Sequence, residues 1–392
     1  MARVLISLLG GRPLPNITGV LHFKPDCLYL IASQDSMGPG GNYEKAVNAL
    51  PNHLKPAQPL AVKPYALQEI VRLCQDIASK HRDDEIVINS ASEPKTMAFG
   101  AYDVAKELKA HGAQIDLCYS SREGLVWVFR ETDNVEPLKI GLEGYLASYG
   151  WNVCLPNDDP PAQFQQLAAL LYDRLPASHR LQHVVRSSSG GKGKRTIRCA
   201  QRLSEDEYAL LKEIEALGIL GNVRRDDKGV TWTIQPEEER GFLLGGHWLE
   251  YSVCRVARMS TGARSKLLFD RCAWGIEDTA GKGEIDFAGI FDGQMLIASC
   301  KTEDDIKRAW FEELHSRAEQ LGKGMCSTML VSTVSRRTRD ETSQREYEKW
   351  ARERQIVLVM AEDLAKLSAI FNKIVLADSK AEPQTIPCYP RI

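Results

Sequence analysis

Apolar and polar positions along the first 130 residues follow two alternating patterns. Short runs of aliphatic and β-branched residues predict strands, and stretches with apolar residues at helical spacing predict helices. The predicted strands are 4–9, 27–33, 85–90 and 115–120, and the predicted helices are 66–80 and 95–111. Because strands that alternate with helices are typical of βα units, we expect a Rossmann-like α/β domain with a doubly wound sheet.

The loops that follow the predicted strands indicate where a ligand would bind. Three of the strands end in Ser or Asn before a polar or glycine-containing loop, and the carboxyl edge of such a sheet is the usual ligand-binding edge. The chain has no Walker A loop and no GxGxxG motif. A nicotinamide-dependent oxidoreductase, one alternative for a Rossmann-like start, therefore lacks its glycine fingerprint and the acidic residue that follows it.

The middle of the chain changes character. The segments 157–163 (NDDPPAQ) and 186–195 (RSSSGGKGKR) are typical of loops or linkers. Ser204 with Glu207 three positions later predicts a capped helix, and an Asp-Lys-Gly turn at 227–229 predicts a hairpin. A small winged-helix-like module is one interpretation of this region.

From Gly245 onward the pattern predicts a second α/β domain. A helix is followed by strands at 284–291, 295–301, 327–333 and 356–360, with helices between the later strands. The chain of 392 residues is too long for one ordinary core. We therefore expect domains at 1–140 and 241–392, joined by a connecting region at 141–240.

Charge and cysteine usage narrow the partners and the compartment. With a formal net charge of −2, binding to nucleic acid would depend on local basic patches. The candidates for such patches are Lys192, Lys194, Arg195 and Arg198, and Arg336, Arg337 and Arg339. The ten cysteines form no CxxC pair, which favours free thiols in a reducing cytoplasm.

No segment is long and apolar enough to predict a membrane span. The apolar run at the N-terminus ends at Gly10 and Gly11 without a small-residue cleavage site, so we interpret it as a strand and not as a signal peptide. We expect a soluble, cytoplasmic protein.

Residues 281–305 carry the strongest chemical signal. They predict a hairpin in which Asp286 lies near the start of one strand and Lys301 at the end of the next, so antiparallel pairing brings the two together. Phosphodiester hydrolysis needs a divalent cation, an activated water and a cationic group near the developing charge. Glu250, on a predicted helix, would add a second oxygen ligand for a hard cation, and Gln320 could be aimed at the same edge.

The run Gly-Glu-Ile-Asp, a hydrophobic strand and then Cys-Lys-Thr resembles the nuclease motif of the PD-(D/E)XK superfamily, which has a restriction-endonuclease-like α/β fold. In that motif the Asp corresponds to Asp286 and the Lys to Lys301, while the usual Glu is Ser299. Three alternatives follow: Glu250 or Glu303 compensates, the metal is held more weakly, or activity is lost. Ser299 is itself a candidate participant, and we expect Cys300 to face the core.

The chain more narrowly resembles CRISPR-associated ancillary nucleases, which join such a domain to a CARF sensor of cyclic oligoadenylates. Residues 6–16 and 88–107 carry this resemblance: glycines allow close backbone approach, and a helix beginning near Lys95 offers an anion site. The family's Gly-Gly-Thr-Lys run is replaced here by residues 92–96. The expected ligand-binding residues are Ser7, Leu8, Leu9, Gly10, Gly11, Pro15, Asn16, Ser33, Ser90, Ser92, Lys95 and Thr96.

The resemblance covers residues 1 to about 130 and 245 to about 365. It implies that a cyclic oligoadenylate, expected to be tetra-adenylate, binds across a homodimer and releases a Mn²⁺- or Mg²⁺-dependent nuclease acting on DNA, RNA or both. A two-fold ligand suits a two-fold protein. The alternative is a ligand-responsive nucleic-acid-binding regulator with a degenerate nuclease fold, motivated by Ser299 and the winged module.

Overall fold

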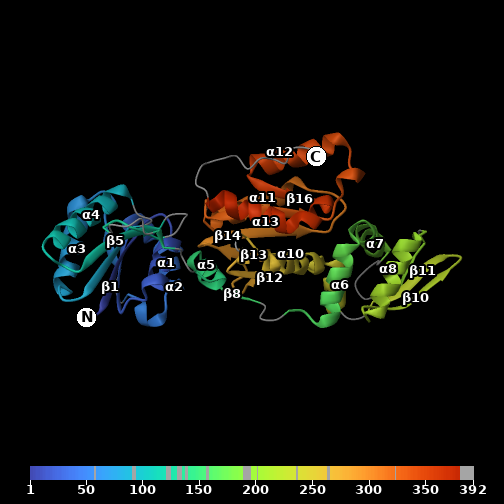
Figure 1. Cartoon of the computed structure of the whole chain (residues 1–392), viewed down its shortest axis with the longest axis horizontal. Helices are drawn as coiled ribbons and strands as arrows, with labels where there is room; N and C mark the ends of the chain where they lie inside the picture. The colour runs from blue at the N-terminus through green and yellow to red at the C-terminus, as the bar shows by residue number, and fades with distance from the viewer. Residues whose placement is uncertain are drawn as a thin grey trace.

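A computed structural model of the chain describes most of its residues (Figure 1). The described ranges are 1–56, 59–90, 94–120, 125–129, 135–136, 140–155, 159–188, 196–200, 202–234, 237–262, 265–322 and 324–379. Among these residues, no helix has both the length and the apolar character needed to cross a bilayer.

The N-terminal part is a seven-stranded sheet in the order β3-β2-β1-β4-β5-β6-β7. Its strands are β1 (Arg3–Leu9), β2 (Cys27–Ser33), β3 (Leu60–Val62), β4 (Glu85–Ser90), β5 (Ile115–Ser120), β6 (Leu125–Trp127) and β7 (Val135–Glu136). Its helices are α1 (Leu14–Phe23), α2 (Asn42–Ala49), α3 (Leu67–Lys80) and α4 (Lys95–Ala110), with short 3-10 turns at Gln34–Ser36 and Asn52–Leu54. β1 to β5 are parallel, whereas β6 and β7 are antiparallel additions.

The parallel strands are covered on both faces, as expected for a doubly wound sheet. Along β1, Val4 and Ile6 pack on the side of α3 and α4, while Leu5 and Leu9 pack on the side of α1 and α2. The four strands and two helices expected in this part are confirmed. α1 was not expected, because Pro13 precedes it and Pro15 lies in its first turn, so that its start resembles a loop.

The segment expected to be a connecting region contains regular structure. Its elements are α5 (Leu142–Ser148), β8 (Val153–Cys154), α6 (Ala162–Asp173), α7 (Leu175–Ser188), β9 (Thr196–Cys199), α8 (Glu205–Ala216), β10 (Leu220–Asp226), β11 (Gly229–Ile234) and α9 (Glu237–Leu244). The capping box of α8 is confirmed, because Ser204 and Glu207 each accept the other's backbone N–H. The expected hairpin is also confirmed as β10 and β11, which pair with β9 in a three-stranded sheet.

The C-terminal part is a six-stranded sheet in the order β16-β15-β14-β13-β12-β8. Its strands after β8 are β12 (Arg271–Asp278), β13 (Glu284–Phe291), β14 (Gln294–Lys301), β15 (Cys326–Ser332) and β16 (Ile356–Val359). Its helices are α10 (His247–Met259), α11 (Arg308–Gln320), α12 (Glu341–Glu353) and α13 (Leu367–Ser379), with 3-10 turns at Arg336–Thr338 and Ala361–Lys366. Helices α10 and α13 cover one face of the sheet, and α11 and α12 cover the other.

The β13–β14 hairpin forms as expected and ends in a two-residue turn. Phe291 pairs with Gln294, and between them Asp292 and Gly293 have φ values of 45° and 75°. Two left-handed residues are the signature of the tight turn that suits twisted antiparallel strands. β12 was not expected, since charged residues and Gly275 interrupt its apolar pattern.

The N-terminal and C-terminal sheets are joined through the segment at α5 and β8 (Figure 1). β8 pairs with the edge strand β12, and α5 packs against α1 and α2 on one side and β13 on the other. The C-terminal sheet therefore includes residues from before position 155 as well as those after 270.

Candidate functional site

The structure brings Asp286 and Lys301 together at the point where β13 and β14 separate. Their described pairing ends at Phe287 opposite Ala298. Beyond it, Oδ2 of Asp286 accepts hydrogen bonds from the Cys300 backbone N–H at 2.7 Å and from Lys301 Nζ at 3.3 Å. The Asp286 carboxylate thus takes the place of backbone pairing at the end of the hairpin.

Ser299, which stands at the position of the family's Glu, also contacts Asp286. Its hydroxyl donates to Oδ2 at 3.2 Å, so all three described donors converge on the same oxygen. Among the described residues, none donates a hydrogen bond to the other carboxylate oxygen, Oδ1. One oxygen is therefore held by the protein and the other is left for a further ligand.

Lys301 remains a cation in this setting. Burial acts to lower the pKa of Lys301, but the charge of Asp286 and the hydrogen bond to it act in the opposite direction, and the pKa is raised overall. An ammonium beside a carboxylate is the pair that a phosphate-cleaving site uses near developing negative charge.

Glu250 lies on α10 and is almost completely buried. It is 6% exposed, and no described residue makes a hydrogen bond to its Oε2. Burial, followed by the charges of Asp286 and Glu284, raises the pKa of Glu250 to about 9, while Lys301 acts to lower it. An unpartnered buried carboxylate is costly, so this oxygen is a strong candidate for binding a cation.

Two further residues extend this group beyond those expected from the sequence. The ligand atoms of His247, Glu250 and Glu284 all lie within 4.8 Å of one another. Burial and the charge of Asp286 raise the pKa of Glu284, with His247 and Lys301 acting to lower it. Two features of the sequence could have indicated that His247 and Glu284 belong to the site. His247 and Glu250 have i,i+3 spacing on a predicted helix, and Glu284 is close to Asp286 in the sequence.

Two other expected participants are not brought to this group. Glu303 is exposed and pairs with Lys307 on the loop that leads to α11. Gln320 is exposed at the last residue of α11, and no described hydrogen bond joins it to Asp286 or Glu250. Instead Arg317 lies near the start of β13, where a Cβ on Gly283 would be 3.0 Å from its Nη1.

In the N-terminal part, the expected ligand loops meet at the switch point of the sheet. β1 is flanked by β2 on one side and β4 on the other, and Leu8 pairs with Ser90. The loop with Gly10 and Gly11 therefore adjoins the end of β4, and α4 begins at Lys95 without a side-chain cap. Lys95 is exposed and Thr96 half-buried in the first turn of α4, and a helix N-terminus favours anions.

Several expected ligand-binding side chains belong to the core. Those that are buried are Ser7, Leu8, Leu9, Asn16 and Ser33, because residues on either face of a doubly covered strand lie under helices. Ser7 donates to Asn16 at 2.8 Å and accepts from Asn89 at 3.2 Å, and Asn89 also donates to the Pro15 carbonyl. This buried network fixes the loop after β1. Ser92 lies outside the described residues.

The loop after β1 is linked to the C-terminal sheet through α5. The Tyr145 hydroxyl donates to the carbonyl oxygens of Leu321 and Met325, each 3.0 Å away. Burial raises the pKa of Tyr145 well above its usual value, and the nearby charge of Arg12, from the loop after β1, opposes that rise. One side chain on α5 is therefore anchored by hydrogen bonds to the C-terminal part.

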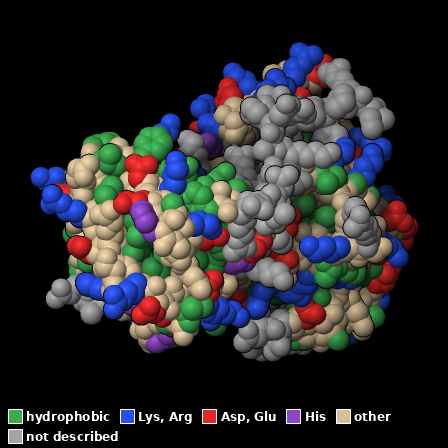
Figure 2. All heavy atoms as spheres, turned by 60° about the vertical axis from the view of Figure 1, so that its left-hand side comes forward, with side chains coloured by type: hydrophobic (Ala, Val, Ile, Leu, Met, Phe, Trp, Pro, Cys, Tyr) green, Lys and Arg blue, Asp and Glu red, His purple; other side chains and the backbone are tan. Residues whose placement is uncertain are grey.

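Three of the residues in the expected basic patches have acidic partners in the structure. Arg198 pairs with Asp226, Arg336 with Asp363 at 2.6 Å, and Arg339 lies 3.9 Å from Asp305. Lys192, Lys194 and Arg195 lie outside the described residues. On the coloured part of the face in Figure 2, basic and acidic side chains are intermixed and form no continuous positive field.

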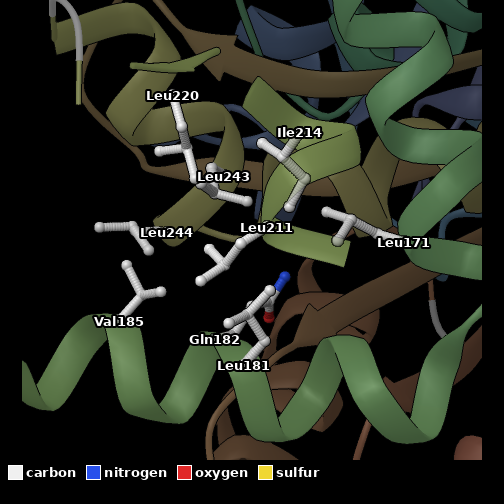
Figure 3. A pocket seen from close by; sticks show the side chains of 9 residues that line it. All are labelled: Leu171, Leu181, Gln182, Val185, Leu211, Ile214, Leu220, Leu243 and Leu244. Atoms are coloured by element: carbon white, nitrogen blue, oxygen red, sulfur yellow. The ribbon is translucent and has the colours of Figure 1, made fainter. Parts of the chain in front are cut away.

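A small apolar pocket lies away from this chemistry, between α6, α7, α8 and α9 (Figure 3). It is lined by Leu171, Leu181, Gln182, Val185, Leu211, Ile214, Leu220, Leu243 and Leu244. Gln182 is the one polar side chain in this lining, and neither atom of its amide has a hydrogen-bond partner. With no charged group in the lining, this pocket is not a candidate for hydrolytic chemistry.

Comparison with known proteins places the fold. No protein-family model and no curated protein sequence matches the chain. Among solved structures, protein VC1899 from Vibrio cholerae matches with a TM-score of 0.73 at 17% identity, covering 96% of this chain and 98% of that one. Can2 from Sulfobacillus thermosulfidooxidans, solved with cyclic tetra-adenylate, matches with a TM-score of 0.70 at 14% identity, covering 95% of this chain and 99% of that one.

A third structure, a type III CRISPR defence DNA nuclease activated by cyclic oligoadenylate, matches with a TM-score of 0.53 at 16% identity, covering 85% of this chain and 45% of that one. The chain therefore shares the two-part α/β fold of these proteins along nearly its whole length. The expected fold is confirmed, including the order of its two parts.

Proposed function

We propose that this protein is a metal-dependent nuclease switched on by a cyclic oligoadenylate. The observation that carries the proposal is the convergence of Asp286, Lys301 and the unpartnered, buried Glu250 where β13 and β14 separate. Among the described residues, none donates a hydrogen bond to Oε2 of Glu250, and a bound cation would compensate this buried group in its ionised form.

The residues present fit a divalent cation. Oδ1 of Asp286 and the carboxylate of Glu250 would hold Mn²⁺ or Mg²⁺ through oxygen ligands. When bound, such a cation neutralises phosphate charge and lowers the pKa of a bound water. Asp286 is held in place by the Cys300 N–H, and the Lys301 ammonium would orient the scissile phosphate and stabilise the charge that develops on it.

The sensing half of the proposal rests on the switch point between β1 and β4. The N-terminus of α4, with Lys95 at its first turn, suits the phosphates of a cyclic oligoadenylate. The similar fold of Can2 in complex with cyclic tetra-adenylate supports this ligand. We propose that a homodimer binds one ring across its two-fold axis, since both have the same symmetry.

One observation favours a second function. Ser299 stands where the related motif has a Glu, and the three described donors on Asp286 all occupy Oδ2. If the remaining ligands are too few, the protein would be a ligand-responsive, nucleic-acid-binding regulator with an inactive nuclease fold.

The test is cleavage of supercoiled plasmid and of single-stranded DNA and RNA, with Mn²⁺ or Mg²⁺, at a series of cyclic oligoadenylates. We expect cleavage only with a metal and a matching activator. Tight activator binding without cleavage of any substrate, in every metal tried, would instead support the regulator.

A further inference from the structure

We propose that His247 is a ligand of the catalytic cation, making it a mixed nitrogen and oxygen site that prefers Mn²⁺ to Mg²⁺. This inference deepens the proposed function and rests on the metal site described there. The related sequence motif has no residue that corresponds to His247.

The first support is the spacing of the side chains. His247 is the first residue of α10 and Glu250 the fourth, so both project from the same face of its first turn. Together with Glu284 at the start of β13, they place three ligand atoms within 4.8 Å of one another. Ligands about 2.0–2.3 Å from a shared cation would lie roughly 3 to 4.6 Å apart, which this spacing allows.

The second support is the state of Glu250. A cluster of acidic residues alone would be an ordinary surface feature, but here one member is 6% exposed and has an oxygen with no hydrogen-bond partner among the residues that the structure describes. Such an atom in a packed protein calls for a ligand that supplies positive charge.

The third support is the space beside that oxygen. Gly275 in β12 has a φ of +55°, and a Cβ built on it would lie 3.9 Å from Oε2 of Glu250, with no other described atom outside its chain neighbours within 4 Å. A left-handed glycine in mid-strand is costly for other residues. At this position it leaves room next to the unpartnered oxygen.

The chemistry of imidazole gives the selectivity. Mg²⁺ strongly prefers oxygen ligands, whereas Mn²⁺ accepts a histidine nitrogen, and affinities for nitrogen-containing sites rise along the divalent transition metals. With Ser299 unable to supply a carboxylate, His247 would supply a further ligand from the first turn of α10. This exchange of an oxygen ligand for a nitrogen ligand would shift the binding preference from Mg²⁺ toward Mn²⁺.

The experiment measures Mn²⁺ binding to the full-length protein by calorimetry and pulsed electron paramagnetic resonance, without activator or substrate. In the parent protein we expect a ¹⁴N coupling on bound Mn²⁺. In His247→Ala we expect that coupling to be lost and the affinity for Mn²⁺ to fall by about tenfold or more. His315→Ala, which removes an exposed histidine of α11, is the matched control and should keep both. His247→Asp restores an oxygen ligand and should shift the binding preference toward Mg²⁺.

Thermal unfolding of each metal-free variant verifies that it is folded, and His247→Asp provides a second test if His247→Ala is unstable. Bound Mn²⁺ without ¹⁴N coupling, or an unchanged affinity in His247→Ala, would overturn the inference. Either result could coexist with metal-dependent cleavage, which leaves the proposed function standing. Conversely, ¹⁴N-coupled Mn²⁺ without cleavage under any activator would support the site and refute the nuclease.

Discussion

The backbone N–H of Cys300 donates a 2.7 Å hydrogen bond to Oδ2 of Asp286, at the end of the described pairing between β13 and β14. The Asp286 carboxylate therefore has a structural role as well as its proposed catalytic role. A substitution that removes the acceptor leaves a buried N–H unpaired, at a cost of about 1–3 kcal/mol.

We therefore expect Asp286→Asn to separate the structural role from the proposed catalytic role better than Asp286→Ala. The amide oxygen can still accept from Cys300, while the loss of negative charge removes a cation ligand. Cleavage should fall by about a hundredfold or more in Asp286→Asn and in Lys301→Ala, with activator affinity and thermal midpoint close to the parent. If either variant cuts at the parental rate, the active site lies elsewhere.

Replacing Ser299 with Glu restores the residue of the related motif. Because the Ser299 hydroxyl lies 3.2 Å from Asp286 Oδ2, a carboxylate reaching from this position would add an oxygen ligand near the cation. Ser299→Glu should keep or raise cleavage and improve activity in Mg²⁺ relative to Mn²⁺. Ser299→Gln, which has a similar size without the charge, is the control. Abolished cleavage in Ser299→Glu alone would mean that Ser299 has a role of its own.

The raised pKa of Glu250 predicts a pH-dependent stability for the metal-free protein. In the unfolded chain this carboxyl ionises near its usual pKa of about 4.5, and in the folded protein near 9. The folded state therefore holds an extra proton between these values, so this contribution to stability is present below pH 4.5 and is lost as the pH rises toward 9. Ionisation of the buried group would cost up to about 1.4 kcal/mol per pH unit.

Glu250→Gln mimics the protonated acid, so in the presence of a chelator it should exceed the parent in stability by an amount that grows from pH 6 to pH 9. Denaturant unfolding at several pH values measures the difference. A difference that does not change with pH would mean that Glu250 is already ionised in the folded protein.

Lys95→Ala should weaken cyclic oligoadenylate binding without changing the metal requirement. A charge-assisted contact to phosphate is worth about 1.5–3 kcal/mol, which corresponds to roughly tenfold or more in affinity. Calorimetry measures the affinity, and Lys106→Ala, three turns further along the same helix, is the control. Equal affinity in Lys95→Ala and the parent would place the ligand away from the N-terminus of α4.

Gln182→Leu should stabilise the protein. The Gln182 side chain is 1% exposed in an apolar pocket, and neither amide atom is hydrogen-bonded. Replacement by an apolar side chain of similar size removes this unpaired group and should raise the free energy of unfolding by about 1–3 kcal/mol. Denaturant unfolding measures the change. A lower stability would mean that the Gln182 amide has a partner that leucine cannot replace.

The sequence was most informative where one local pattern determined the result. The hairpin of β13 and β14 follows from alternating residues around an Asp-Gly turn, and antiparallel pairing then requires Asp286 and Lys301 to meet. In the same way, the spacing of Ser204 and Glu207 was enough to predict the capped start of α8.

The remainder of the candidate site depends on contacts that no local pattern encodes. The space beside Glu250 depends on Gly275, and the interrupted pattern of β12 gave no reason to predict that strand. His247 joins the site only because α10 packs against β12 and β13. The buried positions of Ser7 and Asn16 likewise depend on α1, a helix that the sequence did not predict because of the prolines at its start.

The pairing of β8 with β12 affects how this protein can be dissected. A fragment that starts at residue 241, where the sequence alone places a domain boundary, would lack β8, α5 and α6. The backbone groups of β12 that pair with Val153 and Cys154 would then be exposed, beside apolar surface that α5 and α6 normally cover. Unpaired strand edges of this kind promote aggregation. Insolubility of a C-terminal fragment would therefore reflect the missing strand β8 and not an intrinsic instability of the C-terminal part.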